Sequence, residues 1–294
     1  MKVPADDRLV TLLDALARQE GPNSTSLPEV KLFRITQPLP RHAAVYEPWI
    51  IIVGRGSKRV YLGGDVYVYD TDNYLVTAVP MPIECEAPRA SPRDPILLLA
   101  VSVDPVMIGE LLLEMKSQSP GTRSVPRGLY ASPLTQPLKD AAVRLLDSLQ
   151  SPADCNVLGR LCVREIVYRV LCGEGGDALR ALARGDTDFA PISRVLDYLH
   201  RNYADPIDIE SLARHARMSP STFYQKFRAV TTLSPLQYLK RVRLGKARLL
   251  MLQDGCTASA AAFAVGYESA PQFSREYKRQ FGVTPGQEAR IMRG

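Results

Sequence analysis

The sequence predicts an α+β protein whose N-terminal half is rich in β-structure and whose C-terminal part is helical. Three observations lead to this prediction. Residues 30–103 contain short β-branched and aromatic runs separated by glycine, proline and aspartate. From residue 104 onward, apolar residues recur with helical spacing instead. Roughly the last hundred residues repeat at a fixed interval, which is typical of a duplicated structural unit.

Composition limits the class of protein. The 294 residues are 46% hydrophobic and 23% charged, as expected for a globular protein with two compact domains. No stretch approaches the length of a membrane-spanning helix, and residues 1–10 do not resemble a signal peptide. The five cysteines include no CxxC pair, so we expect reduced thiols rather than a disulfide framework. We therefore expect a cytoplasmic protein with no membrane partner.

The runs within residues 30–103 predict a β-barrel or a sandwich. The expected strands are residues 49–53, 59–62, 66–69, 74–79, 83–85 and 96–103. Gly63 and Gly64 predict a hairpin turn between two of them. The candidates for lining a small-molecule pocket inside the barrel are Trp49, Ile51, Val53, Tyr61, Val76 and Met81. A second interpretation stays open, in which these side chains only fill the core.

Residues 104–172 predict helices packed on the barrel. Asp104 and Pro105 are typical of a helix start, and that helix is expected to end near Met115. Residues 135–149 and 154–172 predict a pair of helices, which either joins two copies in a homodimer or covers the core of its own domain. Glycines amid polar residues then mark a boundary. We expect an N-terminal domain at 1–176, a linker containing a short helix at 177–189, and a C-terminal domain at 190–294.

The C-terminal segment carries the whole basic excess of the chain. Residues 189–294 contain 16 Lys and Arg against 8 Asp and Glu, whereas the remainder has a net charge of −2. Such a segment attracts polyanions such as DNA. A solvated basic surface would have the same composition, so charge alone does not decide between the two.

An internal repeat decides in favour of DNA. Shifting the segment by 50 positions aligns Ser219 with Ser269 and Phe223 with Phe273 without a gap. Each copy predicts a short helix (209–216 and 260–265), a turn, and a second helix capped by the serine, which is a helix-turn-helix. Gly266 suits the positive φ of such a turn. Between the copies, residues 235–252 predict one helix about 27 Å long, which can hold two reading helices about one turn of B-DNA, near 34 Å, apart.

These residues resemble the AraC/XylS family of transcription regulators. Two segments are similar to its paired helix-turn-helix units, SLARHARMSPSTFYQKFRAVTTLSPLQYLKRVRLGKARLLM and AFAVGYESAPQFSREYKRQFGVTP. One N-terminal subgroup of the family resembles the segment YEPWIIIVGRGSKRVYLGGDVYVYDTDNYLV, which implies a cupin-like barrel with a regulatory role. Thr232 departs from the family, which usually has glycine there. If this residue is left-handed, its side chain costs about 1 to 2 kcal/mol.

The resemblance implies a regulator that binds double-stranded DNA, works as an activator with RNA polymerase, and responds to a small-molecule effector. Its base-reading positions correspond to Ser221, Tyr224, Gln225, Gln272 and Arg275. Arg275 suits guanine O6 and N7, and Gln272 suits adenine N6 and N7. Candidates for phosphate contacts, which position the protein without reading sequence, are Ser219, Lys226, Arg228, Arg243, Lys246, Ser269, Lys278 and Arg279. Each of these basic side chains could equally be a solvated surface charge.

An enzyme is the least favoured interpretation. The three histidines are His42, His200 and His215, so the barrel lacks the cluster that a metal centre needs. The barrel region also lacks a GxSxG or phosphate-loop motif. We expect neither catalysis nor a cofactor. The second-ranked alternative is a DNA-binding regulator whose N-terminal domain only dimerises and binds no ligand.

Overall fold

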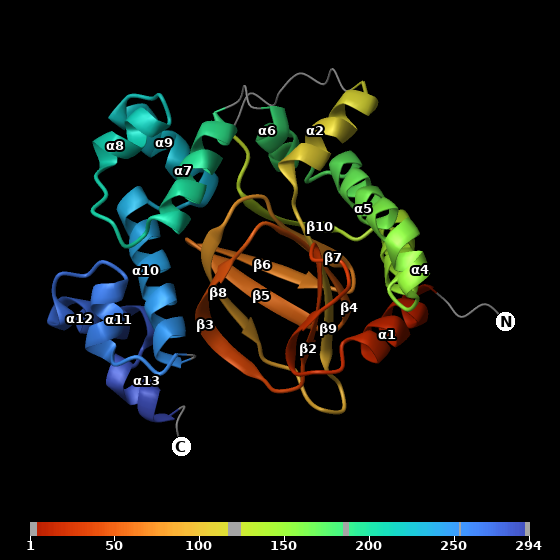
Figure 1. Ribbon diagram of the computed structural model, residues 1–294, viewed down its shortest axis with the longest axis horizontal. Coiled ribbons are helices and arrows are strands. Elements are labelled where there is room, and N and C mark those ends of the chain that lie inside the picture. The colour runs from red at the N-terminus through yellow and green to blue at the C-terminus, as the bar shows by residue number, and fades with distance from the viewer. Residues whose placement is uncertain (1–4, 117–124, 185–187, 253, 292–294) are drawn as a thin grey trace.

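The structure is a computed structural model that describes residues 5–116, 125–184, 188–252 and 254–291. A β-rich part lies at the centre, with one group of helices on its right and the C-terminal helices on its left (Figure 1). No helix in these described ranges is long and apolar enough to cross a membrane. The prediction of an N-terminal β-region with helices, followed by an all-helical part, is confirmed.

The described strands form two antiparallel sheets. The six-stranded sheet has the order β1 (Gly21–Ser24), β2 (Val30–Ile35), β9 (Ile96–Ser102), β4 (Trp49–Arg55), β7 (Asn73–Thr77) and β10 (Leu129–Pro133). The four-stranded sheet has the order β3 (Leu39–Tyr46), β8 (Met81–Ala87), β5 (Ser57–Leu62) and β6 (Asp65–Asp70). Leu62 pairs with Asp65 across the predicted Gly63-Gly64 turn, where Gly63 has φ +62°. The hairpin prediction is therefore confirmed.

The strands form two facing sheets that are not closed into a barrel, so of the barrel and the sandwich that the sequence left open, the structure has the sandwich arrangement. Strands β6 and β7 follow each other along the chain but belong to different sheets. The Asp70 carboxylate accepts hydrogen bonds from the backbone N–H groups of Asp72 and Asn73, both at 3.0 Å. This Asx turn directs the chain from one sheet to the other, so the two strands do not form a ladder.

Two strands lie outside the predicted range of residues 30–103. β1 occupies one edge of the six-stranded sheet, and β10 occupies the other by pairing with β7. β10 falls within residues 104–172, where only helices were expected. Both strands are short, and each contains a proline, Pro22 or Pro133, which sequence patterns assign to turns. Such residues are tolerated at a sheet edge because one side of an edge strand needs no ladder partner.

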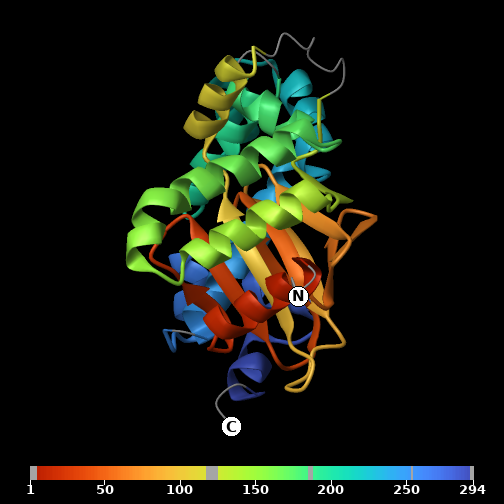
Figure 2. The same cartoon turned by 90° about the vertical axis from the view of Figure 1, so that its right-hand side faces the viewer.

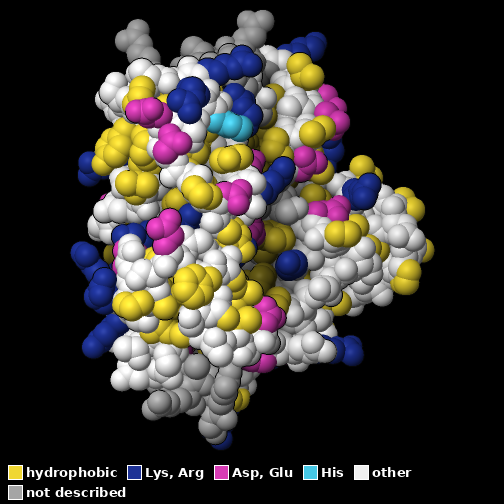
Figure 3. All heavy atoms as spheres, turned by 60° about the vertical axis from the view of Figure 1, so that its left-hand side comes forward, with side chains coloured by type: hydrophobic (Ala, Val, Ile, Leu, Met, Phe, Trp, Pro, Cys, Tyr) yellow, Lys and Arg dark blue, Asp and Glu magenta, His cyan; other side chains and the backbone are white. Residues whose placement is uncertain are grey.

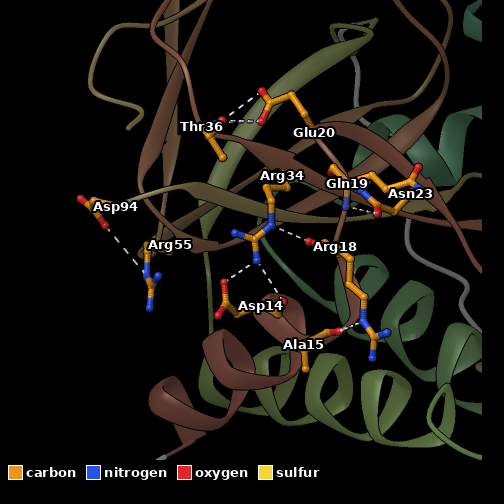
Figure 4. Close-up of polar contacts among 11 residues, drawn as sticks. Asp14, Ala15, Arg18, Gln19, Glu20, Asn23, Arg34, Thr36, Arg55 and Asp94 are labelled. Atoms are coloured by element: carbon orange, nitrogen blue, oxygen red, sulfur yellow. Dashed lines mark hydrogen bonds and ion pairs between the residues drawn. The ribbon is translucent and has the colours of Figure 1, made fainter. Parts of the chain in front are cut away.

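An N-terminal helix that the sequence did not reveal covers the six-stranded sheet. α1 (Ala5–Leu16) packs against β2, β4 and β9, with Leu9 and Leu13 buried. Arg34 of β2 fixes its end, because the guanidinium donates to the Ala17 carbonyl at 2.5 Å and pairs with Asp14 at 2.5 Å (Figure 4).

The predicted helices after the sheets are confirmed. α2 (Pro105–Glu114) begins after Asp104, whose carboxylate accepts from the Val106 N–H. α3 (Gln136–Ser148) contacts both α1 and α5 (Arg160–Cys172), and these helices cross in front of the sheet (Figure 2). A three-residue helix α4 (Pro152–Asp154) and a π-helical turn (Cys155–Gly159) precede α5. The short helix expected inside the linker is α6 (Asp177–Arg184), which packs on α2.

The C-terminal part contains seven described helices. They are α7 (Phe189–Arg201), α8 (Ile209–His215), α9 (Pro220–Thr231), α10 (Pro235–Leu252), α11 (Ala258–Ala264), α12 (Ala270–Phe281) and α13 (Pro285–Ile291). The bounds of α10 confirm the predicted long helix. One apolar core extends from Leu9 in α1 to Val242 in α10, and so includes the interior of α7 to α9. A separate core formed around Phe273 supports α11 and α12.

Candidate nucleic-acid interface and ligand cavity

The first helix-turn-helix unit consists of α8 and α9. The Asp208 carboxylate accepts from the Ser211 N–H at 2.7 Å, and the Ser219 hydroxyl accepts from the Thr222 N–H at 3.3 Å, so both helices are capped as their sequences allow. Phe223 and Phe227 are fully buried, with ring centroids 5.5 Å apart. Burial of this face leaves the opposite face of α9 in solvent.

The second unit repeats this arrangement with α11 and α12. Thr257 and Ser269 cap the two helices. Phe273 and Tyr277 are buried, with ring centroids 5.3 Å apart. The Tyr277 hydroxyl donates to Glu288 of α13, and Glu288 also accepts from Arg248 of α10 at 2.5 Å. This buried network joins α10, α12 and α13.

The two turns differ by one residue. The second helices begin 50 positions apart, at Ser219 and Ser269, whereas the caps of the first helices, Asp208 and Thr257, are 49 apart. The gapless repeat is therefore corrected to a repeat with one additional residue in the second turn. Gly266 has φ +85°, as predicted, while the first turn takes its positive φ at a non-glycine residue, Arg217 (φ +55°).

Thr232 does adopt the left-handed conformation. Its φ is +61°, and Gly282, 50 positions later at the end of α12, has φ +79°. The Thr232 N–H donates to the Arg228 carbonyl at 2.8 Å, which closes the end of α9. The buried Thr232 hydroxyl has no hydrogen-bond partner in the described part of the chain. The first unit thus keeps the glycine geometry with a β-branched residue.

All five base-reading candidates lie on the solvent face of α9 or α12. Ser221, Tyr224, Gln225, Gln272 and Arg275 are exposed. Within the described residues, no side chain binds the Arg275 guanidinium. Gln272 is held differently, because its amide donates to the Glu276 carboxylate at 3.3 Å.

The phosphate candidates fall into two groups. Arg228, Lys278 and Arg279 are exposed. Figure 3, which brings the left-hand side of Figure 1 forward, shows basic side chains projecting from the left edge of that face. Lys226 instead pairs with Asp188 at 2.6 Å. Arg243 donates to the backbone carbonyls of Tyr203 (2.6 Å) and Asp205 (2.9 Å), and burial lowers its pKa.

The other three phosphate candidates are two serines and a lysine. Ser219 and Ser269 form the N-caps of the two reading helices. The Lys246 ammonium lies 5.9 Å from the Tyr203 ring centroid, in cation–π geometry. Arg243 and Lys246 therefore both contact the loop after α7.

Glu276 is a feature of α12 that sequence reasoning missed. It pairs with Lys240 of α10 at 2.8 Å and accepts from the Tyr267 hydroxyl at 2.7 Å. Burial raises the pKa of Glu276, whereas the hydrogen bonds from Lys240, Tyr267 and Gln272 lower it. The hydrogen bonds together outweigh burial, so the pKa of Glu276 lies below its ordinary value. An ionised carboxylate therefore ties the second unit to the connecting helix.

A cavity of about 200 Å³ lies between the two sheets, and we call it the sheet cavity. Of the predicted lining residues, Trp49 and Ile51 line it. Val76 does not, because it pairs with Ile50 and shares the opposite face of the sheet. Tyr61 points outward and donates to Glu86 at 2.7 Å. Val53 and Met81 are buried in the core outside the cavity lining.

The polar wall of the sheet cavity was not predicted. Lys58, Tyr46 and Tyr69 line it from three strands of the four-stranded sheet. The Lys58 ammonium donates to the Tyr46 oxygen at 3.0 Å, and the two phenol oxygens are 2.9 Å apart. Strand alternation was the available signal, because Lys58, Val60 and Leu62 are the inward positions of β5.

Lys58 is buried to 8% exposure and forms no ion pair with any described carboxylate. Burial lowers the pKa of Lys58, but Tyr69 and Cys85 beside it outweigh this effect, and the net shift is upward. Next to Lys58, His42 Nε2 lies 3.4 Å from the Cys85 thiol, and no cluster suited to a metal ion occurs among the described residues.

The four-stranded sheet packs directly on the C-terminal helices. α10 contacts β3 and β8, and α12 contacts β3. The Tyr238 hydroxyl of α10 donates to the Pro80 carbonyl at 2.5 Å and accepts from His200 at 2.8 Å. Gly128 donates its N–H to the Val230 carbonyl at the end of α9 at 2.9 Å. Both helix-turn-helix units are thus in contact with the N-terminal part.

Comparison with known proteins identifies the family. Residues 26–178 match the family described as AraC-type transcriptional regulator N-terminus, and residues 212–290 match a helix-turn-helix domain family. The chain belongs to the AraC-type transcriptional regulators. This is a family of regulators and not of enzymes. The AraC-type N-terminus match covers β2 to β10 with α2, α3 and α5, and the helix-turn-helix match runs from Leu212 within α8 through α12.

Individual AraC-type relatives are distant. The chain is 30% identical over 146 residues to the transcriptional activator RhaS of Escherichia fergusonii, covering 48% of this chain and 51% of that protein. It is 26% identical to the virulence regulon activator VirF of Yersinia enterocolitica, over 61% of this chain and 64% of that protein. The chain thus spans about half the length of the curated relatives that it matches.

A solved structure shares the AraC-type fold over nearly the whole chain. ToxT from Vibrio cholerae, crystallised with an unsaturated fatty acid, has a TM-score of 0.56 at 10% identity. The alignment covers 93% of this chain and 98% of ToxT. At this identity the likeness establishes the fold alone.

Proposed function

We propose that the chain is a sequence-specific regulator of transcription that binds double-stranded DNA through residues 190–294. The observation that carries this proposal is the pair of serine-capped helices, α9 and α12, each with a buried aromatic face and an exposed polar face. The 18-residue helix α10 between them spans about 27 Å, close to the spacing of successive major grooves.

Each reading helix has a distinct role in the proposal. Arg275 is exposed and unbound by described residues, so it is available for two hydrogen bonds to a guanine. Gln272 must leave Glu276 to read an adenine, and Ser221 is too short to discriminate strongly between bases. Tyr224 and Gln225 complete the reading surface of α9. The second unit therefore contributes most of the base discrimination.

Phosphate contacts position the protein on the duplex. Arg228, Lys278, Arg279 and the N-termini of α9 and α12 at Ser219 and Ser269 are available for this role as the chain stands. Lys226, Arg243 and Lys246 contact Asp188 or the loop after α7, so they take part only after breaking those contacts.

The test uses the full chain, because the core of the first unit is continuous with that of the N-terminal part. Selection from random duplexes yields a preferred site, and fluorescence anisotropy measures affinity for it and for single-base variants. Arg275→Ala should cost about 1 to 3 kcal/mol and relax preference at one base pair. Lys278→Ala should weaken every duplex alike and reduce the salt dependence by about one ion. Absence of any preferred duplex at moderate salt contradicts the proposal.

The proposal includes regulation by a small molecule bound in the sheet cavity. Tyr46 lines the cavity from β3, and the same strand is in contact with α10, where the Ala43 carbonyl accepts from Arg248 at 3.5 Å. A ligand against β3 therefore acts on the helix that spaces the two units. A compound that stabilises the protein should change DNA affinity by about 5-fold or more. If no small molecule stabilises the chain, the N-terminal part serves only for dimerisation.

A homodimer is the proposed state on DNA. Val157, Leu161 and Tyr168 lie exposed along one side of the π-helical turn and α5, at 70%, 60% and 36% exposure. Apolar side chains at this spacing form a stripe that a second copy can cover symmetrically. Leu161→Glu should convert a dimer to a monomer in light scattering, and a monomeric wild type excludes the dimer. Activation through RNA polymerase is supported by the naming of RhaS and VirF as activators.

A further inference from the structure

Glu276 holds the amide nitrogen of a reading residue, Gln272. The Gln272 amide donates to Glu276 Oε1 at 3.3 Å, from one turn earlier in α12. The same carboxylate pairs with Lys240 of α10 at 2.8 Å and accepts from the Tyr267 hydroxyl at 2.7 Å. Lys240 and Tyr267 therefore fix the carboxylate on the body of the protein, whereas the Gln272 side chain is exposed on the reading face.

The first unit has no such carboxylate. Glu276 is the only acidic residue of α12, and α9 contains none. Fifty positions before Glu276 stands Lys226, which pairs with Asp188 at 2.6 Å, and fifty positions before Gln272 stands Thr222. The first unit forms the same helix-turn-helix without an acid at this position. The fold alone therefore does not account for the carboxylate of Glu276.

Holding the nitrogen leaves the Gln272 oxygen as the group that faces the groove. In the major groove, adenine and cytosine each present an amine donor, N6 or N4, whereas guanine and thymine present acceptors and no donor. A glutamine oxygen can accept from either amine, but it meets an acceptor on guanine or thymine and stays unpaired. Reading adenine with two bonds also requires the amide nitrogen to donate to N7.

The Glu276 carboxylate opposes the bond to N7. Glu276 is ionised at neutral pH, because its pKa lies below the ordinary value of a carboxyl group. A hydrogen bond to an ionised acceptor is about twice as strong as one between neutral groups, so exchanging Glu276 for N7 replaces a stronger bond by a weaker one. The amide has a second hydrogen, but an N7 bound to it would lie next to the carboxylate, and two acceptors so close repel each other.

We propose that Glu276 is a positioning residue that sets the base specificity of Gln272, so that this side chain reads the amine common to adenine and cytosine instead of adenine alone. This inference rests on the proposed function, because it names what one reading residue of the DNA-binding part recognises. It predicts a target position that accepts adenine or cytosine on one strand and rejects guanine and thymine. Removing the carboxylate should sharpen the preference for adenine.

The first experiment uses the full-length protein and changes single atoms in the DNA. The base pair that Gln272 reads is the one whose preference disappears in Gln272→Ala. Fluorescence anisotropy then compares the four bases at this position of the preferred duplex, together with 7-deazaadenine, which lacks N7. The wild type should bind adenine and cytosine within about threefold of each other, and guanine and thymine at least about tenfold more weakly. It should bind 7-deazaadenine like adenine, because N7 is not contacted.

Two glutamate variants then separate the held amide from the effect of charge. Glu276→Ala should raise the preference for adenine over cytosine to at least about tenfold, and 7-deazaadenine should then bind at least about threefold more weakly than adenine. Glu268→Ala is the matched control, because Glu268 is an exposed acid that lines the same groove, while Gln272 forms its hydrogen bond to Glu276. The control removes the same charge, so it should strengthen all four duplexes alike and leave their ratios unchanged.

Ratios between duplexes do not depend on the fraction of folded protein, so a loss of stability in Glu276→Ala cannot hide the result. Three outcomes would overturn the inference. A wild type that prefers adenine over cytosine about tenfold and binds 7-deazaadenine weakly would show that Gln272 reads N7 beside Glu276. An unchanged base profile in Glu276→Ala would show that the carboxylate only joins helices. Wild-type preferences at every position in Gln272→Ala would remove Gln272 from base reading. In all three cases the protein still has a preferred duplex, whereas failure of the proposed function leaves none.

Discussion

Removing the Tyr238 hydroxyl tests how firmly the N-terminal part holds the connecting helix α10. Tyr238 is 0% exposed, and its hydroxyl donates to the Pro80 carbonyl at 2.5 Å and accepts from His200 at 2.8 Å. Tyr238→Phe removes both hydrogen bonds and leaves the buried Pro80 carbonyl and the half-buried His200 ring without these partners. An unsatisfied buried group costs about 1 to 3 kcal/mol, and the half-buried imidazole costs less because water can reach it, so the free energy of unfolding should fall by about 1 to 3 kcal/mol or slightly more.

Urea denaturation followed by circular dichroism measures this change. The matched control is Tyr61→Phe, because the Tyr61 hydroxyl binds Glu86 at the surface, where water can replace it. The control should lose less than about 1 kcal/mol. A double-mutant cycle with His200→Leu should show coupling, since the two side chains share one hydrogen bond. Wild-type stability of Tyr238→Phe would refute the view that this contact holds α10 against the sheets.

Three further predictions concern pH and backbone geometry. Burial, with a contribution from Lys246, lowers the pKa of His200 to about 4 from its ordinary value of 6.5, so the unfolded chain takes up a proton at a higher pH than the folded one. Stability is therefore complete above about pH 6.5 and falls as the pH drops toward 4; at pH 5 this group should cost about 2 kcal/mol, and His200→Gln should flatten the urea-denaturation profile. Thr232→Gly should raise the free energy of unfolding by about 1 kcal/mol in the same assay, because it relieves the left-handed strain at φ +61°; a loss would mean that the side chain contributes more by packing. Gly266→Ala should destabilise more than Gly282→Ala, since both have positive φ but only at Gly266 would the new methyl group collide with the Ala204 carbonyl; equal melting temperatures would contradict this.

Features governed by local chemistry could be predicted from the sequence. The serine caps, the aromatic pairs four residues apart and the full length of α10 depend on residues close together in the chain, and all three are present. The family usually has glycine at the position of Thr232, which indicated a left-handed backbone there. The structure has this left-handed conformation at Thr232. The roles of the exposed side chains in reading bases stay predictions, since they depend on a partner outside the chain.

Features governed by tertiary contacts could not be predicted. Alternation places Lys58 on the same face of β5 as Val60 and Leu62, but only the pairing of β5 between β6 and β8 shows what this face of the sheet packs against. The extra residue in the second turn does not show when the sequence is aligned with itself. The first helices of the two units are so short that their apolar positions still match when one helix is displaced by one residue. Arg243 looks like a phosphate ligand until the fold brings the carbonyls of Tyr203 and Asp205 within 2.9 Å.

The two helix-turn-helix units are attached to the N-terminal part in different ways. The first unit shares the main apolar core, so its orientation follows that of the sheets. The second unit has its own core and meets the four-stranded sheet through surface contacts, such as Gln280 donating to Glu84 at 3.4 Å. Surface contacts of this kind contribute little free energy compared with a shared core. The first unit is therefore attached to the sheets more firmly than the second, which is held mainly through α10 by the Lys240–Glu276 and Arg248–Glu288 ion pairs.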